Sequence, residues 1–298
     1  MDLKKPLTFE QLADRMEEHH LFMKDRSEVV QFLRQVSYYR LSGYLLSYRV
    51  SENDSDLDGA SFENLLAIYS FDSALRSFLR KYIEIAEVYY RTQISHWFSL
   101  SRCSAPPHDQ HYDERNFYRK QSYREVMQKY RSDKDAYYGD SLVMRHHRMQ
   151  YGGREPLWVI TEILSFSNLS KLYNSMYDID KKLIAASVGT GHDMLSNHLH
   201  CITLLRNKCA HAARLYNTKM SKPVRFPQSF LRANPSIDND SLFAYIVMLL
   251  KRLPDEPLKR AYISDFSHLV EQYRESVDMH LIGMPENYNA VLVNNRYS

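Results

Sequence analysis

Residues 61–100 carry apolar side chains at the spacing of one face of an α-helix, and this stretch constrains the fold more than any other. The apolar positions are Leu65, Ile68, Phe71, Leu75, Phe78, Tyr82, Ile85 and Tyr89. Ser61 stands directly before them, where a residue that caps a helix is expected. The chain has only 8 Gly and 10 Pro in 298 residues, whereas turns and sheets use more. We therefore expect an all-α fold that contains one long helix over residues 61–100.

Shorter helices are expected before and after this one. Thr8 and Gln11 have the spacing of a capping box, which predicts a helix that runs to about His20. Further helices are predicted at about 27–36, 156–177, 181–188, 241–253 and 258–279. Trp158 is expected in the core, and the tail from Ile282 is expected to be loosely ordered. We interpret residues 1–60 as an N-terminal helical extension, 61–220 as the main bundle and 221–298 as C-terminal helices and tail, all in one compact unit.

A second long helix is predicted from Gly191 to Asn217, with Asp193 at its N-cap. On a helical wheel, one side of it is apolar: Ile202, Leu205, Cys209, Ala212 and Tyr216. The other side gathers polar and basic residues: His200, Thr203, Arg206, Asn207, His211, Arg214 and Asn217. The apolar side is expected to pack in the core, and the polar side requires a separate explanation.

The polar side has the residue types that cleave RNA. The strand carries its own nucleophile, the 2′-hydroxyl, so the protein must supply a base and a positive charge for the phosphate. Histidine suits the first task because its unperturbed pKa is about 6.5, and arginine suits the second because its planar guanidinium grips phosphate oxygens. The simpler alternative is a solvated helix face. Spacing alone does not decide between them, because Arg91 and His96 share the spacing of Arg206 and His211.

Longer sequence blocks favour the RNA interpretation. Residues 205–217 read L-R-N-K-C-A-H-x-x-R-L-Y-N, and earlier blocks lie at residues 37–44, 71–76, 87–92 and 155–166. They read S-Y-Y-R-L-S-G-Y, F-D-S-A-L-R, E-V-Y-Y-R-T and E-P-L-W followed by E and L-S-F. In this order the blocks resemble those of HEPN ribonucleases in the abortive-infection (Abi) family, of AbiD/AbiF type. Ala212 stands where that family usually has a second His.

This resemblance implies a HEPN-like helical bundle over residues 61–220 and a metal-independent endoribonuclease without a cofactor. Arg206 and His211 match the family's catalytic Arg and His, and Asn207 lies between them in the motif. Arg214 and Asn217 would support them. The implied biological role is that of a toxin or phage-defence effector, and some relatives are paired with a small non-coding RNA or an antitoxin.

Other charged residues have two interpretations each. Glu87 and Arg91 interrupt the apolar pattern of the first long helix. They are either surface charges or residues that orient His211 or hold the backbone. In residues 37–49, Tyr38, Leu41 and Leu45 are expected to pack against the bundle, and Arg40 is the residue expected to contact RNA.

Residues 114–154 are basic and aromatic, with ten Lys and Arg against five Asp and Glu. Such a mixture suits single-stranded nucleic acid, because cations bind the phosphates and aromatic rings stack on bases. Arg119, Lys120 and Arg124 are the predicted RNA contacts. The alternative is a solvated helix face with the rings packed beneath it.

Three functional classes remain: an RNA endonuclease, an RNA-binding protein that has lost cleavage, and a metal or thiol enzyme. Arg206, Asn207 and His211 are all present, which favours the first. The third is disfavoured because the chain has no H-E-x-x-H or C-x-x-C motif.

Composition predicts a cytoplasmic protein that does not enter the membrane. The three cysteines form no disulfide framework, the opening residues resemble no signal peptide, and the longest apolar run is far shorter than the roughly 20 residues that span a bilayer. We also expect a homodimer, because the motif supplies one imidazole where cleavage needs both an acid and a base.

Overall fold

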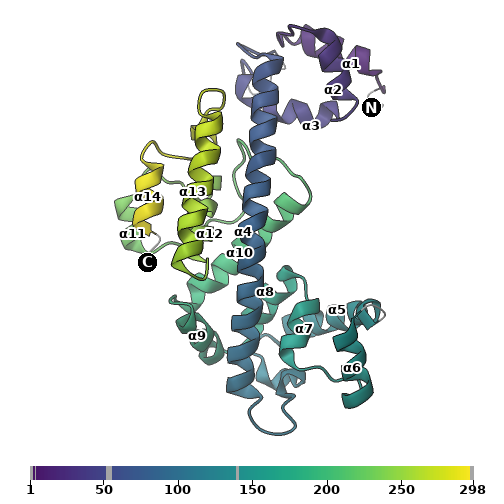
Figure 1. The fold of residues 1–298 in the computed structure, drawn as a ribbon, viewed down its shortest axis with the longest axis vertical. Helices are drawn as coiled ribbons and strands as arrows, with labels where there is room; N and C mark the ends of the chain where they lie inside the picture. Colours follow the sequence, from purple (N-terminus) through teal and green to yellow (C-terminus); the bar gives the residue numbers. More distant parts are fainter. Residues whose placement is uncertain (1–2, 4, 52–55, 139–140, 296–298) are drawn as a thin grey trace.

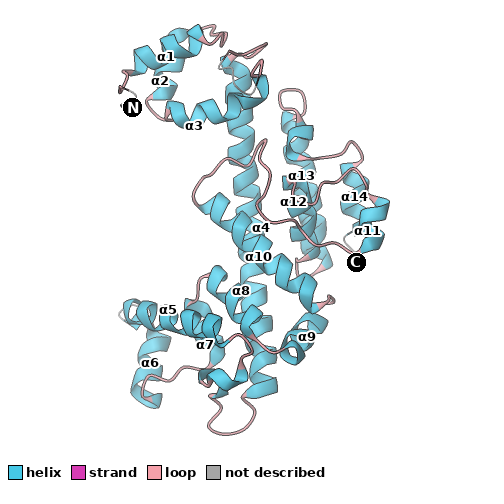
Figure 2. Cartoon of the chain, turned by 180° about the vertical axis from the view of Figure 1, so that it is seen from behind, coloured by secondary structure: helices cyan, strands magenta, loops and turns pink. Residues whose placement is uncertain are grey.

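The computed structural model describes residues 3, 5–51, 56–138 and 141–295, and throughout this part the chain is all-α, as predicted (Figures 1 and 2). Its only β-type pairings there are isolated bridges. The α-helices are α1 Phe9–Glu18, α2 Arg26–Leu33, α3 Tyr38–Ser42, α4 Phe62–Arg102, α5 Lys120–Tyr138, α6 Leu142–Tyr151, α7 Leu157–Ile163, α8 Phe166–Ser175, α9 Asp178–Ser187, α10 His192–Ala210, α11 Gln228–Ala233, α12 Leu242–Lys251, α13 Glu256–Tyr273 and α14 Tyr288–Asn295. A 3₁₀ helix, η1 Gly43–Tyr48, follows α3 directly.

Helix α4 is the axis of the molecule, and the other helices are distributed along it (Figure 1). The predicted cap is confirmed, because the Ser61 side chain accepts a hydrogen bond from the Asn64 N–H. Helices α1–α3 lie at the N-terminal end of α4 and α5–α7 toward its C-terminal end, while α10, α12 and α13 pack beside it. Every residue of α12 is buried. The division at residues 60 and 220 stays a prediction.

Several predicted helix boundaries differ from those in the structure; the helix predicted over 258–279, for example, is α13 Glu256–Tyr273. In two cases a short side chain explains the difference. Helix α2 begins one residue earlier than expected, because the Asp25 carboxylate accepts from the Ser27 N–H and caps it. The helix predicted over 156–177 is two helices, α7 and α8. Leu164 is extended and the Ser165 side chain caps α8 by accepting from the Asn168 N–H. The capping box of Thr8 and Gln11 is confirmed.

Helix α10 ends at Ala210, well before the predicted end at Asn217. His211 is the C-cap and Ala212 has a φ of +49°, which turns the chain out of the helix. The Ala213 N–H bonds the Lys208 carbonyl and the Ala212 N–H bonds the Cys209 carbonyl, the two hydrogen bonds of a Schellman motif. The N-cap is Gly191 rather than Asp193.

Arg214 and Asn217 therefore do not share a helix face with Arg206, and the helical-wheel placement of these two residues was wrong. Asn217 has a φ of +49° in a later turn. Asparagine tolerates this left-handed conformation better than most residues do. The backbone of the turn therefore explains why an asparagine stands at position 217.

Replacing Ala212 by Gly is expected to stabilise the protein by about 1 kcal/mol, because Gly adopts a positive φ without the steric penalty that a Cβ brings. The free energy of unfolding in urea measures the effect. Ala210→Gly is the matched control, since Ala210 is exposed and still helical, and there the same change is expected to destabilise by about 1 kcal/mol. A loss of stability in Ala212→Gly would contradict the interpretation of this turn.

Two packing predictions are also wrong. The tail from Ile282 is not loosely ordered as far as residue 295, because α14 buries Val291 and Leu292 against α12 and α13. Trp158 is 57% exposed, since it lies on the outer face of α7 while Leu157 and Ile160 face the core.

No helix in the described ranges combines the length and apolar character needed to cross a bilayer.

Candidate active site at the end of α10

The last turn of α10 and its cap present Arg206, Asn207 and His211 to solvent. Asn207 and His211 lie one helical turn apart, because the His211 N–H donates to the Asn207 carbonyl at 3.0 Å. The Arg206 side chain is 45% exposed. An imidazole, a guanidinium and an amide are therefore available together on one short stretch of surface, with α10 packed against α4 beneath them.

Glu87 of α4 connects this turn to the body of the molecule. One of its carboxylate oxygens, Oε1, lies 3.4 Å from Arg206 Nε, and the other lies 3.8 Å from an Arg91 nitrogen. Burial raises the pKa of the Glu87 carboxyl, and the positive charges of Arg206 and Arg91 oppose this rise. Glu87 thus contacts Arg206, a partner that differs from those considered from the sequence, where Glu87 was either a surface charge or a residue that orients His211 or holds the backbone.

Arg91 holds the backbone, which was one of its two predicted roles. Its guanidinium donates to the carbonyls of Thr161 and Leu164, the second at 2.6 Å. These carbonyls belong to the last turn of α7 and the residue that follows it, where α7 gives way to α8. Arg91 therefore fixes the position of α7 on α4 and at the same time faces Glu87.

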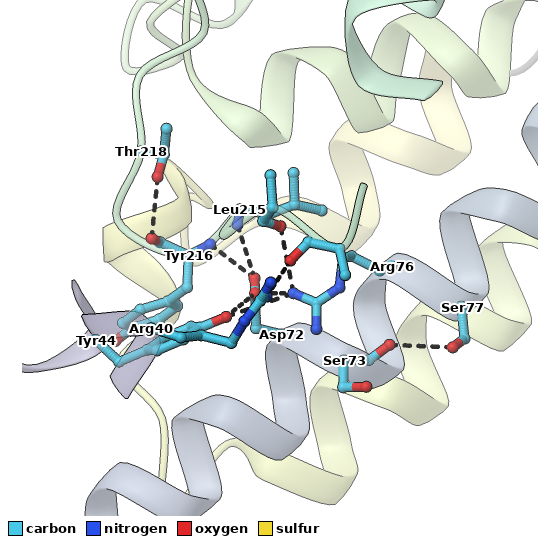
Figure 3. A network of polar contacts seen from close by, with 11 residues as sticks. Arg40, Tyr44, Asp72, Ser73, Arg76, Ser77, Leu215, Tyr216 and Thr218 are labelled. Atoms are coloured by element: carbon cyan, nitrogen blue, oxygen red, sulfur yellow. Dashed lines mark hydrogen bonds and ion pairs between the residues drawn. The ribbon is translucent and has the colours of Figure 1, made fainter. Parts of the chain in front are cut away.

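Asp72 of α4 organises the chain after His211 (Figure 3). Its carboxylate is fully buried, and Oδ1 accepts from the backbone N–H groups of Leu215 at 3.0 Å and Tyr216 at 2.8 Å. Oδ2 accepts from the Tyr44 hydroxyl at 2.6 Å and pairs with the buried guanidinium of Arg76. Burial and the Asp72 charge raise the pKa of Tyr44, which therefore stays a hydroxyl donor. A single carboxylate thus joins η1, α4 and the segment after α10.

Two arginines cross between the N-terminal helices and this segment. Arg40 of α3 donates to the Ala212 carbonyl, and Arg214 donates to the Gly43 carbonyl. Arg76 adds a weaker hydrogen bond to the Ala213 carbonyl at 3.4 Å. The carbonyls of both residues that follow His211 thus accept from arginines, and the chain reversal is held at each step. Arg40 lies beside the site, but its observed contact is to protein backbone, and its RNA contact stays a prediction.

Sequence reasoning missed the roles of Asp72, Arg76 and Tyr44, although each lies within a block quoted above. The available signal was the position of Asp72 and Arg76 on α4. They stand one turn apart and adjoin Phe71 and Leu75, so they fall on the face that the apolar pattern buries. Charged residues on a buried helix face require partners. Asp72 and Arg76 pair with each other, and Asp72 also accepts from backbone groups more than 140 residues away.

Arg119, Lys120 and Arg124 are exposed near the start of α5. Arg124 forms a two-bond ion pair with Glu114, at 2.7 and 2.9 Å, so its charge is partly neutralised. The rings of Phe117, Tyr123 and Tyr130 are buried, as the packing alternative expects. Asp140 and the side chains of Tyr137 and Tyr138 lie outside the described residues. The RNA-binding role of this segment stays a prediction.

The chain was compared with protein families, curated proteins and solved structures. The model of a family described as "Abi-like protein" matches residues 31–217. No curated protein and no solved structure matches the chain. The matched span begins in α2 and ends at Asn217, so it contains Arg40, Asp72, Glu87 and the exposed turn of α10. It also contains both sides of the contacts that fix the chain after His211.

Proposed function

Given that this chain belongs to the Abi-like protein family, we propose that it is a metal-independent endoribonuclease of HEPN type. It would act in the cytoplasm as a toxin or abortive-infection effector against phage. The observation that carries the proposal is the exposed turn of Arg206, Asn207 and His211, which is followed at once by a segment fixed through a buried carboxylate. Reactive side chains on a rigid support are what positioning of a scissile phosphate requires.

The chemistry assigns a role to each residue of the turn. A base removes the proton of the 2′-hydroxyl, the 2′-oxygen bonds to phosphorus, and the bond from phosphorus to the 5′-oxygen breaks. The departing oxygen takes a proton and the products are a 2′,3′-cyclic phosphate and a 5′-hydroxyl. His211 is the proton-transfer group, Arg206 stabilises the phosphate charge, and the Asn207 amide hydrogen-bonds the phosphate. Glu87 positions Arg206 through their ion pair.

The competing function is RNA binding without cleavage, in association with a small RNA or antitoxin. The ion pair of Arg206 with Glu87 favours it, because a paired guanidinium has less charge to offer a phosphate. The two functions differ in their products. End-labelled RNA incubated with the purified full chain is expected to yield fragments with 2′,3′-cyclic phosphate ends, with and without EDTA. Intact RNA that remains bound would support the competing function, and strong inhibition by EDTA would indicate metal chemistry.

The single imidazole leads to a proposal about assembly. The nearby His200 lies eleven residues before His211, about 16 Å along the helix axis, so it does not serve the same phosphate. A homodimer with the end of α10 near its two-fold axis would supply a second His211 and a second Arg206 to one shared site.

A mixed dimer tests the shared site. A chain with His211→Ala and a chain with Arg206→Ala are co-expressed with different tags, and the heterodimer is isolated. Its RNA cleavage rate is expected to differ from that of either mutant homodimer, because its site combines residues of both chains. A fully active monomer, established by light scattering at the assay concentration, would exclude the shared site.

Charge reversal in the basic segment is expected to weaken RNA binding. In the triple variant Arg119→Glu, Lys120→Glu and Arg124→Glu, the slope of log affinity against log salt should fall by roughly 1–2. Each phosphate contact contributes about 0.7 for a single strand, and Arg124 is already paired with Glu114. Fluorescence anisotropy of labelled RNA across a salt series measures this slope. Arg260→Glu on α13 is the control, and an unchanged slope in the triple variant would assign the segment to the scaffold.

A further inference from the structure

A groove lies between the N-terminal helices and the segment that follows His211. It consists of two adjoining pockets of about 460 and 520 Å³, which share Tyr39, Ser42 and Arg49 in their linings. The smaller pocket also has Arg40 and Arg214 in its walls, and the larger has Lys5, Arg15, His19 and Tyr38. The smaller pocket includes Ala213, two residues after His211, so the groove begins beside the candidate active site.

Cationic side chains predominate in the lining of this groove, and Asp56 lies beside it, 3.4 Å from His19 Nδ1. Lys5, Arg15, Arg40, Arg49 and Arg214 line it, and none of the residues given for either wall is an Asp or a Glu. Over the described ranges the four arginines form no ion pair with a carboxylate, whereas Arg76, Arg91, Arg124 and Arg206 all do. Clustered cations that form no ion pair within the described part of the chain raise the local potential and attract anions.

Two of these arginines are held in place without being neutralised. Arg40 donates to the Ala212 carbonyl and Arg214 to the Gly43 carbonyl, and a carbonyl orients a guanidinium while leaving its full charge. A guanidinium has five N–H donors, so each keeps donors for a phosphate after this contact. These residues are therefore both a structural connection and preorganised groups for binding an anion.

Tyr39 adds a second kind of contact. Its side chain is 89% exposed, although it is a large aromatic residue and belongs to the lining of both pockets. An uncovered ring beside cations is the arrangement that binds single-stranded nucleic acid, because the ring stacks on an unpaired base while the cations hold the backbone. A base within a duplex is already stacked on its neighbours and does not offer its face in this way.

We propose that this groove binds the single-stranded RNA that flanks the scissile phosphate. Arg15, Arg40, Arg49 and Arg214 hold its phosphates, and Tyr39 stacks on one of its bases. The proposal rests on the proposed function, because the strand is taken to be the substrate of His211. The groove is thus a second proposed RNA-binding surface, in addition to the basic segment 114–154. The N-terminal helices thus take part in substrate binding, and the groove selects unpaired strands over duplexes.

The test is equilibrium binding of a fluorescent single-stranded RNA to the full chain with His211→Ala, so that no strand is cut during the measurement. In this background, Arg15→Glu together with Arg49→Glu is expected to weaken binding at least tenfold and to lower the salt slope by about 1.4. Arg49 is exposed and Arg15 is half-buried. Arg232→Glu, on exposed helix α11 at the opposite side of the molecule, is the matched control and is expected to leave affinity unchanged (Figures 1 and 2).

Stacking is tested separately at Tyr39. Tyr39→Ala is expected to weaken binding about tenfold with the salt slope unchanged, and Tyr39→Phe should retain the affinity because the ring remains. Unchanged binding in both the double charge variant and Tyr39→Ala would overturn the proposal. So would equal competition by a polyglutamate peptide or by duplex RNA. If the groove variants lose binding while the unmodified protein cleaves no RNA, the groove stands and the proposed nuclease function fails.

Discussion

Replacing His211 by Ala, or Arg206 by Ala, is expected to abolish RNA cleavage and toxicity while the protein still folds. Loss of a positioned proton-transfer group costs about 10²–10⁴ in rate, and loss of a group that stabilises the developing charge costs about 10²–10³. Both residues are exposed. Removal of the His211 side chain should change the free energy of unfolding by about 0.5 kcal/mol or less, and removal of Arg206, which pairs with Glu87, by about 1 kcal/mol. Single-turnover cleavage of labelled RNA, together with urea unfolding, separates the two effects.

The chain contains its own matched control for this experiment. Arg91 and His96 have the same sequence spacing, and His96 is exposed on α4, so His96→Ala removes an exposed imidazole without touching the turn of α10. It is expected to cleave at the wild-type rate. Full activity of His211→Ala or of Arg206→Ala would refute the proposed mechanism. Activity lost equally in His96→Ala would show that the assay reports something other than this site.

Replacing Asp72 by Ala is expected to lower the free energy of unfolding by about 3–5 kcal/mol, which is the usual cost of removing one partner of a buried ion pair. The change leaves the Arg76 guanidinium buried without its counter-charge, and it leaves the N–H groups of Leu215 and Tyr216 without their acceptor. RNA cleavage should also fall, although Asp72 is buried and does not reach a substrate, because the segment after His211 loses its anchor.

Asp265→Ala is the control for Asp72, since Asp265 pairs with Lys81 at 2.7 Å but is 40% exposed, and such pairs contribute about 1 kcal/mol or less. If Asp72→Ala does not fold, Asp72→Asn is the variant to measure in its place. Its amide oxygen can still accept from Leu215 and Tyr216, so it should lose less stability than Asp72→Ala. If urea unfolding gave Asp72→Ala and Asp265→Ala the same small loss, Asp72 would not be the organising residue.

The all-α class and the extent of α4 could be predicted because both are local properties. Apolar side chains recur at helical spacing between Ser61 and Arg102, and the cap lies next to them in the sequence. The end of α10 could not be predicted in the same way. Helical propensity continues past Ala210, and no Gly marks the turn at Ala212. The Schellman hydrogen bonds there are local, but the contacts that hold the turn come from α3, η1 and α4.

One part of the candidate site could also be predicted, because that part is local in the sequence. Arg206, Asn207 and His211 lie on a single turn, so the sequence brings them together directly, and the structure shows them exposed. The contact of Glu87 with Arg206 needs the packing of α4 against α10, and the sequence does not specify which residues of two long helices face each other. Arg214 and Asn217 were misplaced because one wrong helix boundary moves every residue after it.

The crossed contacts of Arg40 with Ala212 and of Gly43 with Arg214 join residues 172 and 171 positions apart. A ribosome adds about 5–20 residues per second, so α3 emerges roughly 10–30 s before the carbonyl that Arg40 binds. Until then, the N-terminal helices have no partner for these contacts and the support of His211 is incomplete. If the protein has the proposed nuclease activity, this order of assembly would keep nascent chains inactive until residues 212–216 have been synthesised and have folded back onto α4.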